Sequence, residues 1–531
     1  MAEKVLQMVF LFGSILVLAW LGILAKRRVK TSDDLLVGGR SFTRWDIFWS
    51  LFAFWGGNTI SSIIELSFKD GVVGAWFGIA RICMLFVIVF ITGGAFRKLA
   101  MITLSSFVSR CFDAPVLKVV VGIIIAFNSI IFTVSSVVGA AAFFTAIMGW
   151  SITISILITV CSFLAYTTLG GMHALSVNGK VLTIGQVLAL IILVGVGVWQ
   201  AGWGNITNLE PRYFDFLPES QIGTVMMWLF TFLLNAFVAQ GALQIMMSCR
   251  DLREGQRGVF YVLSGFVPVI ILSVTAGLAA RVLFPDINPI AAMPTLASNM
   301  PFAILSALVV MGMYFTTLGW ASTSILYGGT VMANDVYRYF VPNASSDKLI
   351  QVSRISIIAM AFMTIGFAIL LPSGIAFWSI VGFVVRNAGL FPLIMVGLFW
   401  NAMSRNASIL AVVVGSIVGM AWYLISFPQF LFGAHPMFVA MLTSMLLISL
   451  VTLIEYRGQW MWQSSGLGLA FLAMGLILTG VAFGSDIVTS KDLTFPFVSY
   501  AACFYFAAML FLMKRRGLDG KPYVFELTLD D

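Results

Sequence analysis

The sequence predicts an all-α integral membrane protein, and two features of the chain support that fold class. The first is composition: 60% of the 531 residues are hydrophobic and 10% are charged, whereas a soluble globular protein is about 45–50% apolar and about 25% charged. The second is the distribution of the apolar residues, which form about fifteen segments long enough to cross a bilayer as helices. Helices are expected because hydrocarbon offers backbone N–H and C=O groups no partner outside their own segment.

The first apolar segment has no small-residue cleavage motif and is long enough to span, so we expect a transmembrane helix and not a removed signal. The fourth and ninth segments are long enough to tilt or to extend beyond the bilayer. In chain order the predicted spans lie near 5–25, 46–68, 73–95, 117–147, 151–169, 180–200, 222–247, 259–284, 302–333, 351–371, 375–400, 407–426, 436–455, 467–484 and 496–513.

Basic residues are concentrated in alternate loops. The loops after the first and third spans carry the clusters Lys26, Arg27, Arg28, Lys30, Arg40 and Arg44, and then Arg97, Lys98 and Arg110. The loops between them carry mainly Asp and Glu. The positive-inside rule therefore predicts a multi-pass protein of the cytoplasmic membrane, with its N-terminus outside and its C-terminus in the cytoplasm.

Several function classes have no support in the sequence. The net charge of +8 comes from short loops between apolar spans, so it does not indicate nucleic-acid binding. The five cysteines form no CxxC pair and there are only two histidines, so we expect no metal site and no cofactor. The chain has no phosphate-binding P-loop and no GxSxG or HExxH motif, so it offers no catalytic residues for an enzyme.

The most informative segment is 52–74, where a predicted span contains helix-weakening and polar residues. Gly56 and Gly57 are adjacent, and each costs about 1 kcal/mol of helix propensity relative to Ala. A polar run and a carboxylate follow them. One interpretation is a glycine-mediated helix contact in which hydroxyls bond to their own backbone; the other is a discontinuous helix that binds a solute or an ion. The polar residues are Asn58, Thr59, Ser61, Ser62 and Glu65.

A second interruption is predicted at Gln240-Gly241 in the seventh span, five spans after the first. Two interrupted helices at matching positions of two five-helix halves indicate an inverted repeat with a central site. The expected divisions are an extra N-terminal helix and basic loop (1–45), a first repeat (46–200), a second repeat (201–405) and peripheral C-terminal helices with a short tail (406–531).

Four stretches resemble one family. Residues 37–40 (VGGR), 56–65, 166–175 (YTTLGGMHAL) and 321–338 are similar, in this order, to segments of the sodium:solute symporter family, over about residues 35–455. The first interrupted helix is most similar to that of choline- and proline-transporter-like members. The resemblance implies a LeuT-type 5+5 inverted repeat with one extra N-terminal and about four extra C-terminal helices.

The resemblance also implies secondary transport of a small organic solute by alternating access. The alternative is a membrane sensor or regulatory subunit of the same family that binds a solute without transporting it and acts through a separate signalling partner. The identity of the solute stays open.

The family pairs two main-chain carbonyls of its first broken helix with neighbouring hydroxyls on its eighth core helix to bind sodium. Here the resemblance places the carbonyls at Thr59 and Ser62, but the hydroxyl pair falls on Gly319 and Trp320, which offer no side-chain acceptor. A slip of one turn would bring in Thr316 and Thr317. We therefore expect transport that does not require sodium, with proton coupling or exchange as the remaining possibilities.

Three charged residues fall within predicted spans: Glu65, Arg81 and Arg386. Such residues are costly in a membrane and mark interior sites, unless they simply pair with one another. Arg386, beside Asn387, is a candidate to bind a substrate carboxylate with both prongs of its guanidinium. Glu65 is a candidate to meet a cationic substrate group or to carry a proton. The rings of Trp55 and Trp320 either line the site and contact a cation or serve as ordinary packing.

Overall fold

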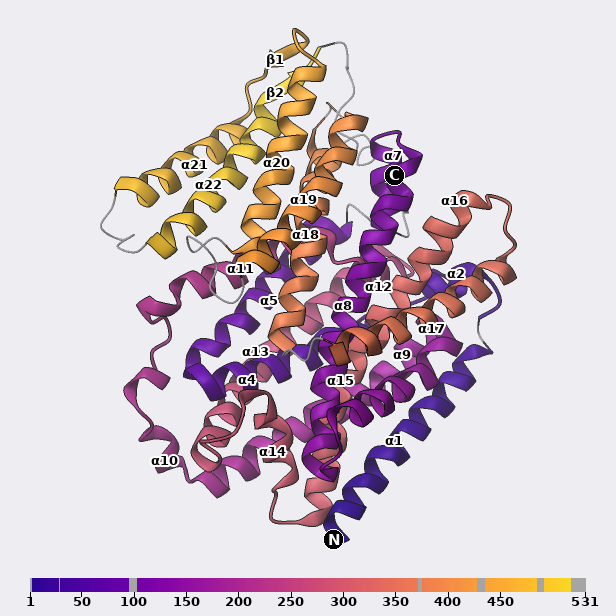
Figure 1. Ribbon diagram of the computed structural model, residues 1–531, viewed down its shortest axis with the longest axis vertical. Coiled ribbons are helices and arrows are strands. Elements are labelled where there is room, and N and C mark those ends of the chain that lie inside the picture. The colour runs from indigo at the N-terminus through magenta and orange to yellow at the C-terminus, as the bar shows by residue number, and fades with distance from the viewer. Residues whose placement is uncertain are drawn as a thin grey trace. The chain divides into compact units, whose positions relative to one another are not determined.

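The computed structural model describes residues 2–27, 29–94, 103–370, 375–400, 402, 404–426, 435–484 and 491–516. Almost all of this part of the chain is helical, and the elements are labelled in Figure 1. Two compact units are present. Unit 1 comprises Met1–Gly94, Ser129–Glu219 and Gln240–Ile380, and unit 2 comprises Ala95–Asn128, Ser220–Ala239 and Val381–Asp531.

Unit 1 contains most of the helices. Its elements are α1 (Ala2–Lys26), α2 (Ser32–Val37), η1 (Gly38–Arg40), α3 (Arg44–Leu51), η2 (Phe52–Gly56), α4 (Gly57–Asp70), η3 (Gly71–Gly74), α5 (Ala75–Val87), η4 (Ile88–Thr92), α9 (Ile152–Ala201), α10 (Trp203–Thr207), η5 (Pro211–Tyr213), α12 (Gln240–Met247), α13 (Leu252–Leu283), η7 (Pro289–Ala291), α14 (Ala292–Ser298), α15 (Ala303–Val331), η8 (Met332–Tyr337), α16 (Arg338–Phe340) and α17 (Ser346–Leu370).

Helix α15 is the centre of unit 1. Every residue from Gly312 to Val331 is buried, so this part of the helix has no side that faces lipid. It packs against α1, α4, α9 and α17, and Figure 1 shows α1 running beside α9. Since the predicted site residues on α15 all lie within this stretch, the helix presents them to its neighbours and not to the bilayer.

Two glycines in the left-handed region set the course of the chain in unit 1. Gly171 (φ 53°, ψ −139°) kinks the 50-residue helix α9 at the Gly-Gly pair of the YTTLGG motif, and a Cβ there would lie 2.5 Å from Leu35 Cδ1. Gly71 (φ 79°) ends α4, and a side chain there would collide with the backbone of Tyr213. In both places a larger residue would be strained and obstructed.

Unit 2 contains α7 (Leu104–Cys111), α11 (Ile222–Val238), α19 (Arg405–Ser426), α20 (Pro436–Glu455), β1 (Trp460–Trp462), α21 (Gly466–Gly484), α22 (Lys491–Leu512) and β2 (Met513–Arg515). Three elements contribute to both units: α8 (Pro115–Met148), η6 (Glu219–Gln221) and α18 (Ile375–Phe399). Strands β1 and β2 pair antiparallel with Met461 opposite Lys514. Helices α21 and α22 pack on each other, as α19 and α20 do (Figure 1).

The predicted number of spans is not confirmed. Thirteen helices of the described residues are long and apolar enough to cross a membrane. The predicted spans 46–68 and 73–95 fall in one candidate span, Arg44–Thr92, within which α4 ends at Asp70 and η3 leads into α5, and the predicted span 151–169 corresponds to a shorter apolar helix, Ile152–Leu164. The predicted fold class, an all-α membrane protein, is confirmed, whereas the inverted repeat and its boundaries stay predictions.

Candidate solute and ion site

The first predicted interruption is not a break in the helix. Residues Phe52–Gly56 form a five-residue π-helix, and α4 follows at once, with Gly56 (φ −60°, ψ −44°) and Gly57 (φ −60°, ψ −52°) both right-handed helical. The prediction of an unwound segment at these glycines is therefore wrong. The backbone stays helical and passes through one π-helical turn. Short π-helical turns of this kind occur frequently at functional sites.

The glycines serve a close contact between helices. A Cβ on Gly57 would collide with the backbone of Thr316 in α15, and a Cβ on Gly319 would collide with the carbonyl of Ala53 in η2. A Cβ on Gly56 would lie 2.8 Å from the ring of Phe52. The glycine-mediated contact that the sequence left open is thus present, with one glycine from each helix.

The hydroxyls around this contact bond to their own helices. Thr59 Oγ1 donates to the Trp55 carbonyl at 2.7 Å, Thr316 Oγ1 to the Met313 carbonyl at 2.6 Å, and Thr317 Oγ1 to the Tyr314 carbonyl at 2.7 Å. This is the back-bonding expected of hydroxyls inside a helix. Ser62 is buried on α4.

One polar contact crosses the interface of α4 and α15. Ser61 Oγ and Thr316 Oγ1 lie 3.0 Å apart, and Ser61 Oγ also lies 3.1 Å from the Gly57 carbonyl. Thr316 therefore faces α4, as the one-turn slip of the resemblance required, but its partner there is the hydroxyl of Ser61 and not the predicted carbonyls of Thr59 and Ser62.

Trp55 and Trp320 enclose a cation that the protein itself supplies. The guanidinium carbon of Arg81, on α5, lies 5.6 Å from each of the two indole centroids and 5.8 Å from the ring of Phe77. Arg81 Nη2 donates to Asn58 Oδ1 at 3.1 Å. Arg81 is fully buried. The two tryptophans therefore contact a cation, as one of the two interpretations predicted, and the cation is the side chain of Arg81.

Trp320 is also fixed by other rings. Its indole stacks on Phe54 with centroids 4.8 Å apart, and its Nε1 donates to the Phe132 carbonyl at 3.1 Å. The ring therefore fills the space beside Gly319 where the resemblance places a hydroxyl.

Glu65 lies apart from the arginine. Its side chain, half-buried on α4, lines a small cavity with Ser61 and Thr317, which is closed by Pro289, Met293 and Pro294 of η7 and α14. The cavity has room for roughly one water molecule. Within the described residues no ion pair joins Glu65 to Arg81, and a pairing of Glu65 with Arg386 stays a prediction.

The second predicted interruption is confirmed. Helix α11 ends at Val238, Ala239 has the non-helical angles φ −76° and ψ 72°, and α12 begins at Gln240. Gln240 is buried, and a Cβ on Gly241 would lie 2.9 Å from Tyr327 and 3.1 Å from Phe54.

In unit 2, Arg386 is bound by amide oxygens. Its Nη1 donates to Asn128 Oδ1 at 3.1 Å, its Nη2 donates to Asn235 Oδ1, and its Nε donates to Asn387 Oδ1 at 3.4 Å. Asn387 Nδ2 in turn donates to the Thr231 carbonyl at 3.3 Å. Arg386 is 3% exposed. The predicted pair Arg386-Asn387 is therefore the centre of a buried polar cluster.

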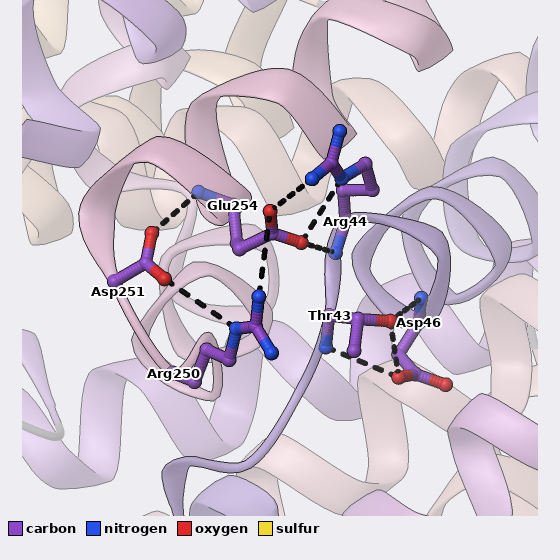
Figure 2. A network of polar contacts seen from close by, with 6 residues as sticks. All are labelled: Thr43, Arg44, Asp46, Arg250, Asp251 and Glu254. Atoms are coloured by element: carbon purple, nitrogen blue, oxygen red, sulfur yellow. Dashed lines mark hydrogen bonds and ion pairs between the residues drawn. The ribbon is translucent and has the colours of Figure 1, made fainter.

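A polar network joins the N-terminus of α3, the helix that precedes η2 and α4, to the N-terminus of α13 (Figure 2). Glu254, at the first turn of α13, accepts from Arg44 Nε (3.1 Å), Arg44 Nη2 (2.6 Å) and the Arg44 backbone N–H (2.8 Å). Arg250 Nη2 lies 3.9 Å from the same carboxylate. Thr43 and Asp46 form a capping box at the N-terminus of α3. Charge-assisted, two-pronged contacts of this kind are the stronger hydrogen bonds of proteins.

The residues that the sequence analysis missed are of two kinds. Asn128 and Asn235 lie inside apolar spans with no charged neighbour along the chain, and nothing in the sequence connects them with Arg386. The polar network had a local signal, because Thr43-x-x-Asp46 and Asp251-x-x-Glu254 are both capping patterns before an apolar run. That pattern predicts the helix starts but not the Arg44–Glu254 contact, which joins residues 210 positions apart.

Comparison with known proteins identifies the family. A model of the sodium:solute symporter family matches residues 35–415. The chain is 22% identical to the high-affinity proline transporter PutP of Bacillus subtilis, over 81% of this chain and 95% of that protein. It is 23% identical to the sodium/proline symporter of Salmonella typhimurium, over 78% of this chain and 86% of that protein.

The fold agrees. The structure of a Na+-coupled sialic acid symporter in a substrate-bound, outward-open state superposes with a TM-score of 0.70 at 17% identity, covering 85% of this chain and 97% of that one. The sequence and fold define a secondary transporter of the LeuT type. The chain belongs to the sodium:solute symporter family, and its family and fold are those of transporters and not of enzymes.

Proposed function

We propose that the protein carries a small organic solute across the cytoplasmic membrane by alternating access, and that this transport does not require sodium. Trp55, Asn58 and Gln240 are the proposed solute-binding residues of unit 1. All three are buried, with 1%, 7% and 1% of their surfaces exposed. A solute reaches them only if the surrounding elements move, which supports a mechanism with more than one conformation.

The observation that carries the sodium independence is the contact between η2–α4 and α15. At Gly57 against Thr316, and at Ala53 against Gly319, the backbones lie too close to admit a methyl group. A hard cation that has lost its water shell needs several oxygen ligands in its place. The close contact at these two points and the ring of Trp320, which contributes a donor where an acceptor is needed, both argue against an ion between Gly319 and the start of α4.

Glu65 is the proposed coupling group. It is a carboxylate on the same helix, one turn beyond Ser61, and it lines a cavity with two hydroxyl-bearing residues. A carboxylate that lines a cavity large enough for one water molecule has a route for taking up and releasing a proton. Proton coupling at Glu65, or exchange of solute without any ion, therefore replaces sodium coupling in this proposal.

The choice of a first solute follows from the relatives. The Bacillus subtilis and Salmonella typhimurium proteins transport proline according to their names. Labelled proline is thus the first probe, followed by a panel of amino acids, betaines and monocarboxylates that compete with it.

The test is uptake by the purified protein in proteoliposomes. The buffers contain potassium or choline and no sodium, and the outside pH is varied. Uptake that proceeds without sodium and rises at acidic outside pH supports the proposal. Uptake that begins only when sodium is added contradicts it and would favour the one-turn slip that brings in Thr316 and Thr317.

A further inference from the structure

The aromatic cage around Arg81 joins three elements at one point. Trp55 comes from η2, Asn58 from α4 and Trp320 from α15, and all three contact the guanidinium of Arg81, which α5 supplies. The distances from the guanidinium carbon to the ring centroids, 5.6 Å, 5.6 Å and 5.8 Å, are within the range of cation–π attraction.

A positive charge at this position contacts residues of η2, α4 and α15 at once, as an ion bound between these elements would. The positive charge of Arg81 contacts the Asn58 side chain of α4 and the Trp320 ring of α15, so both helices share one partner. Trp320 occupies one of the two α15 positions that the family resemblance assigns to ion ligands. Where a sodium site would need oxygen atoms, this chain has ring faces, and ring faces suit an arginine.

We infer that Arg81 is a resident cation that takes the place of the coupling ion in this transporter. The inference rests on the proposed sodium-independent function. Because the guanidinium is covalently attached to α5, it holds the contact between η2, α4 and α15 without being taken up or released. No ion gradient can act through this position, and any coupling must use another group.

The test is chemical rescue of a truncated variant. Arg81→Ala leaves a guanidinium-sized space walled by Trp55, Trp320 and Phe77. We expect the apparent Tm of the purified variant to fall, and low millimolar guanidinium chloride or methylguanidinium to restore at least half of that loss. Sodium chloride and choline chloride at the same concentration should restore none of it, because only a planar cation fits between the rings and donates to Asn58.

The matched control is Arg281→Ala. The guanidinium of Arg281 also lies over two rings, Phe68 at 5.4 Å and Tyr213 at 5.8 Å, but on the exposed end of α13. Guanidinium should not stabilise this variant or the unaltered protein. A second variant, Arg81→Met, fills the space with a neutral chain and should not respond either.

The outcomes are decisive for the inference. If guanidinium leaves the Tm of Arg81→Ala unchanged, or raises that of Arg281→Ala equally, Arg81 is not a resident cation in a specific cage. If the Arg81→Ala protein is obtained folded only when guanidinium is present throughout purification, the inference is supported by that difference in yield. Sodium-dependent uptake by the unaltered protein would refute the proposed function. The rescue experiment measures only whether the site around Arg81 binds a guanidinium, so its result is independent of that uptake.

Discussion

The substitution Gly57→Ala examines the helix contact on which the absence of a sodium site depends. The structure puts a new Cβ at this position into the backbone of Thr316, and not against the tip of a flexible side chain. Relief therefore requires that α4 and α15 move apart. The partner glycine across the contact, Gly319, meets the Ala53 carbonyl in the same way.

The magnitude follows from two opposing effects. Replacing Gly by Ala in a helix gains about 1 kcal/mol of propensity. Overpacking a tight contact costs about 1–3 kcal/mol and more where backbone is hit. Since the obstructing atoms are backbone, we expect the cost to reach or exceed the upper end of that range, which leaves a net loss of about 2 kcal/mol.

The measurement is the apparent Tm of the purified protein in detergent, with the scan rate held fixed because unfolding of such proteins is commonly irreversible. We expect Gly57→Ala to unfold roughly 2–4 °C lower. The control is Gly195→Ala in α9, where the new Cβ meets no atom within 4 Å, and its Tm should be unchanged or higher. If both variants unfold at the same temperature, the two helices are not in close contact and the argument against sodium loses its basis.

Three further substitutions address the remaining groups. Glu65→Gln should abolish any rise of uptake at acidic outside pH while the protein stays folded; a pH response that survives would remove Glu65 from coupling. Glu254→Gln should destabilise the protein by about 1–3 kcal/mol, because it leaves the Arg44 guanidinium without its carboxylate, and unchanged thermal unfolding would mean that the network does not hold α3. Arg386→Lys keeps the charge, but its single nitrogen cannot reach the three amide oxygens that the guanidinium spans with separate nitrogens, so uptake should fall about tenfold if one charged hydrogen bond of about 1.5 kcal/mol is lost; uptake equal to that of the unaltered protein would contradict a role for the planar fork.

The fold was largely predictable because it depends on long-range composition. Membrane helices are apolar over their whole length, and neither a tilt nor a kink hides that signal. The count of about fifteen spans is not confirmed where one helix follows another directly. Between α4 and α5 the chain turns at Gly71, directly after Lys69 and Asp70, with only the short helix η3 in between, and Gly171 kinks α9 without a loop.

The candidate residues could be chosen from the sequence, but their contacts could not. Two adjacent glycines in a membrane helix are compatible with unwinding or with close packing, and only the position of Thr316 across from Gly57 distinguishes the two. The same limit applies to Arg81. Its place in the sequence marked it as buried and functional, but the rings that surround it come from segments 26 and 239 residues away in the case of Trp55 and Trp320.

The most direct test of the account is proline uptake by the purified protein in liposomes, compared in sodium-free potassium buffer and in the same buffer with sodium at millimolar levels. The account predicts equal initial rates in both, because the helices that would bind the ion are in contact and the cation between η2, α4 and α15 is Arg81. If no proline is taken up, the same comparison applies to the first solute of the panel that is. Uptake that appears only with sodium would contradict the account.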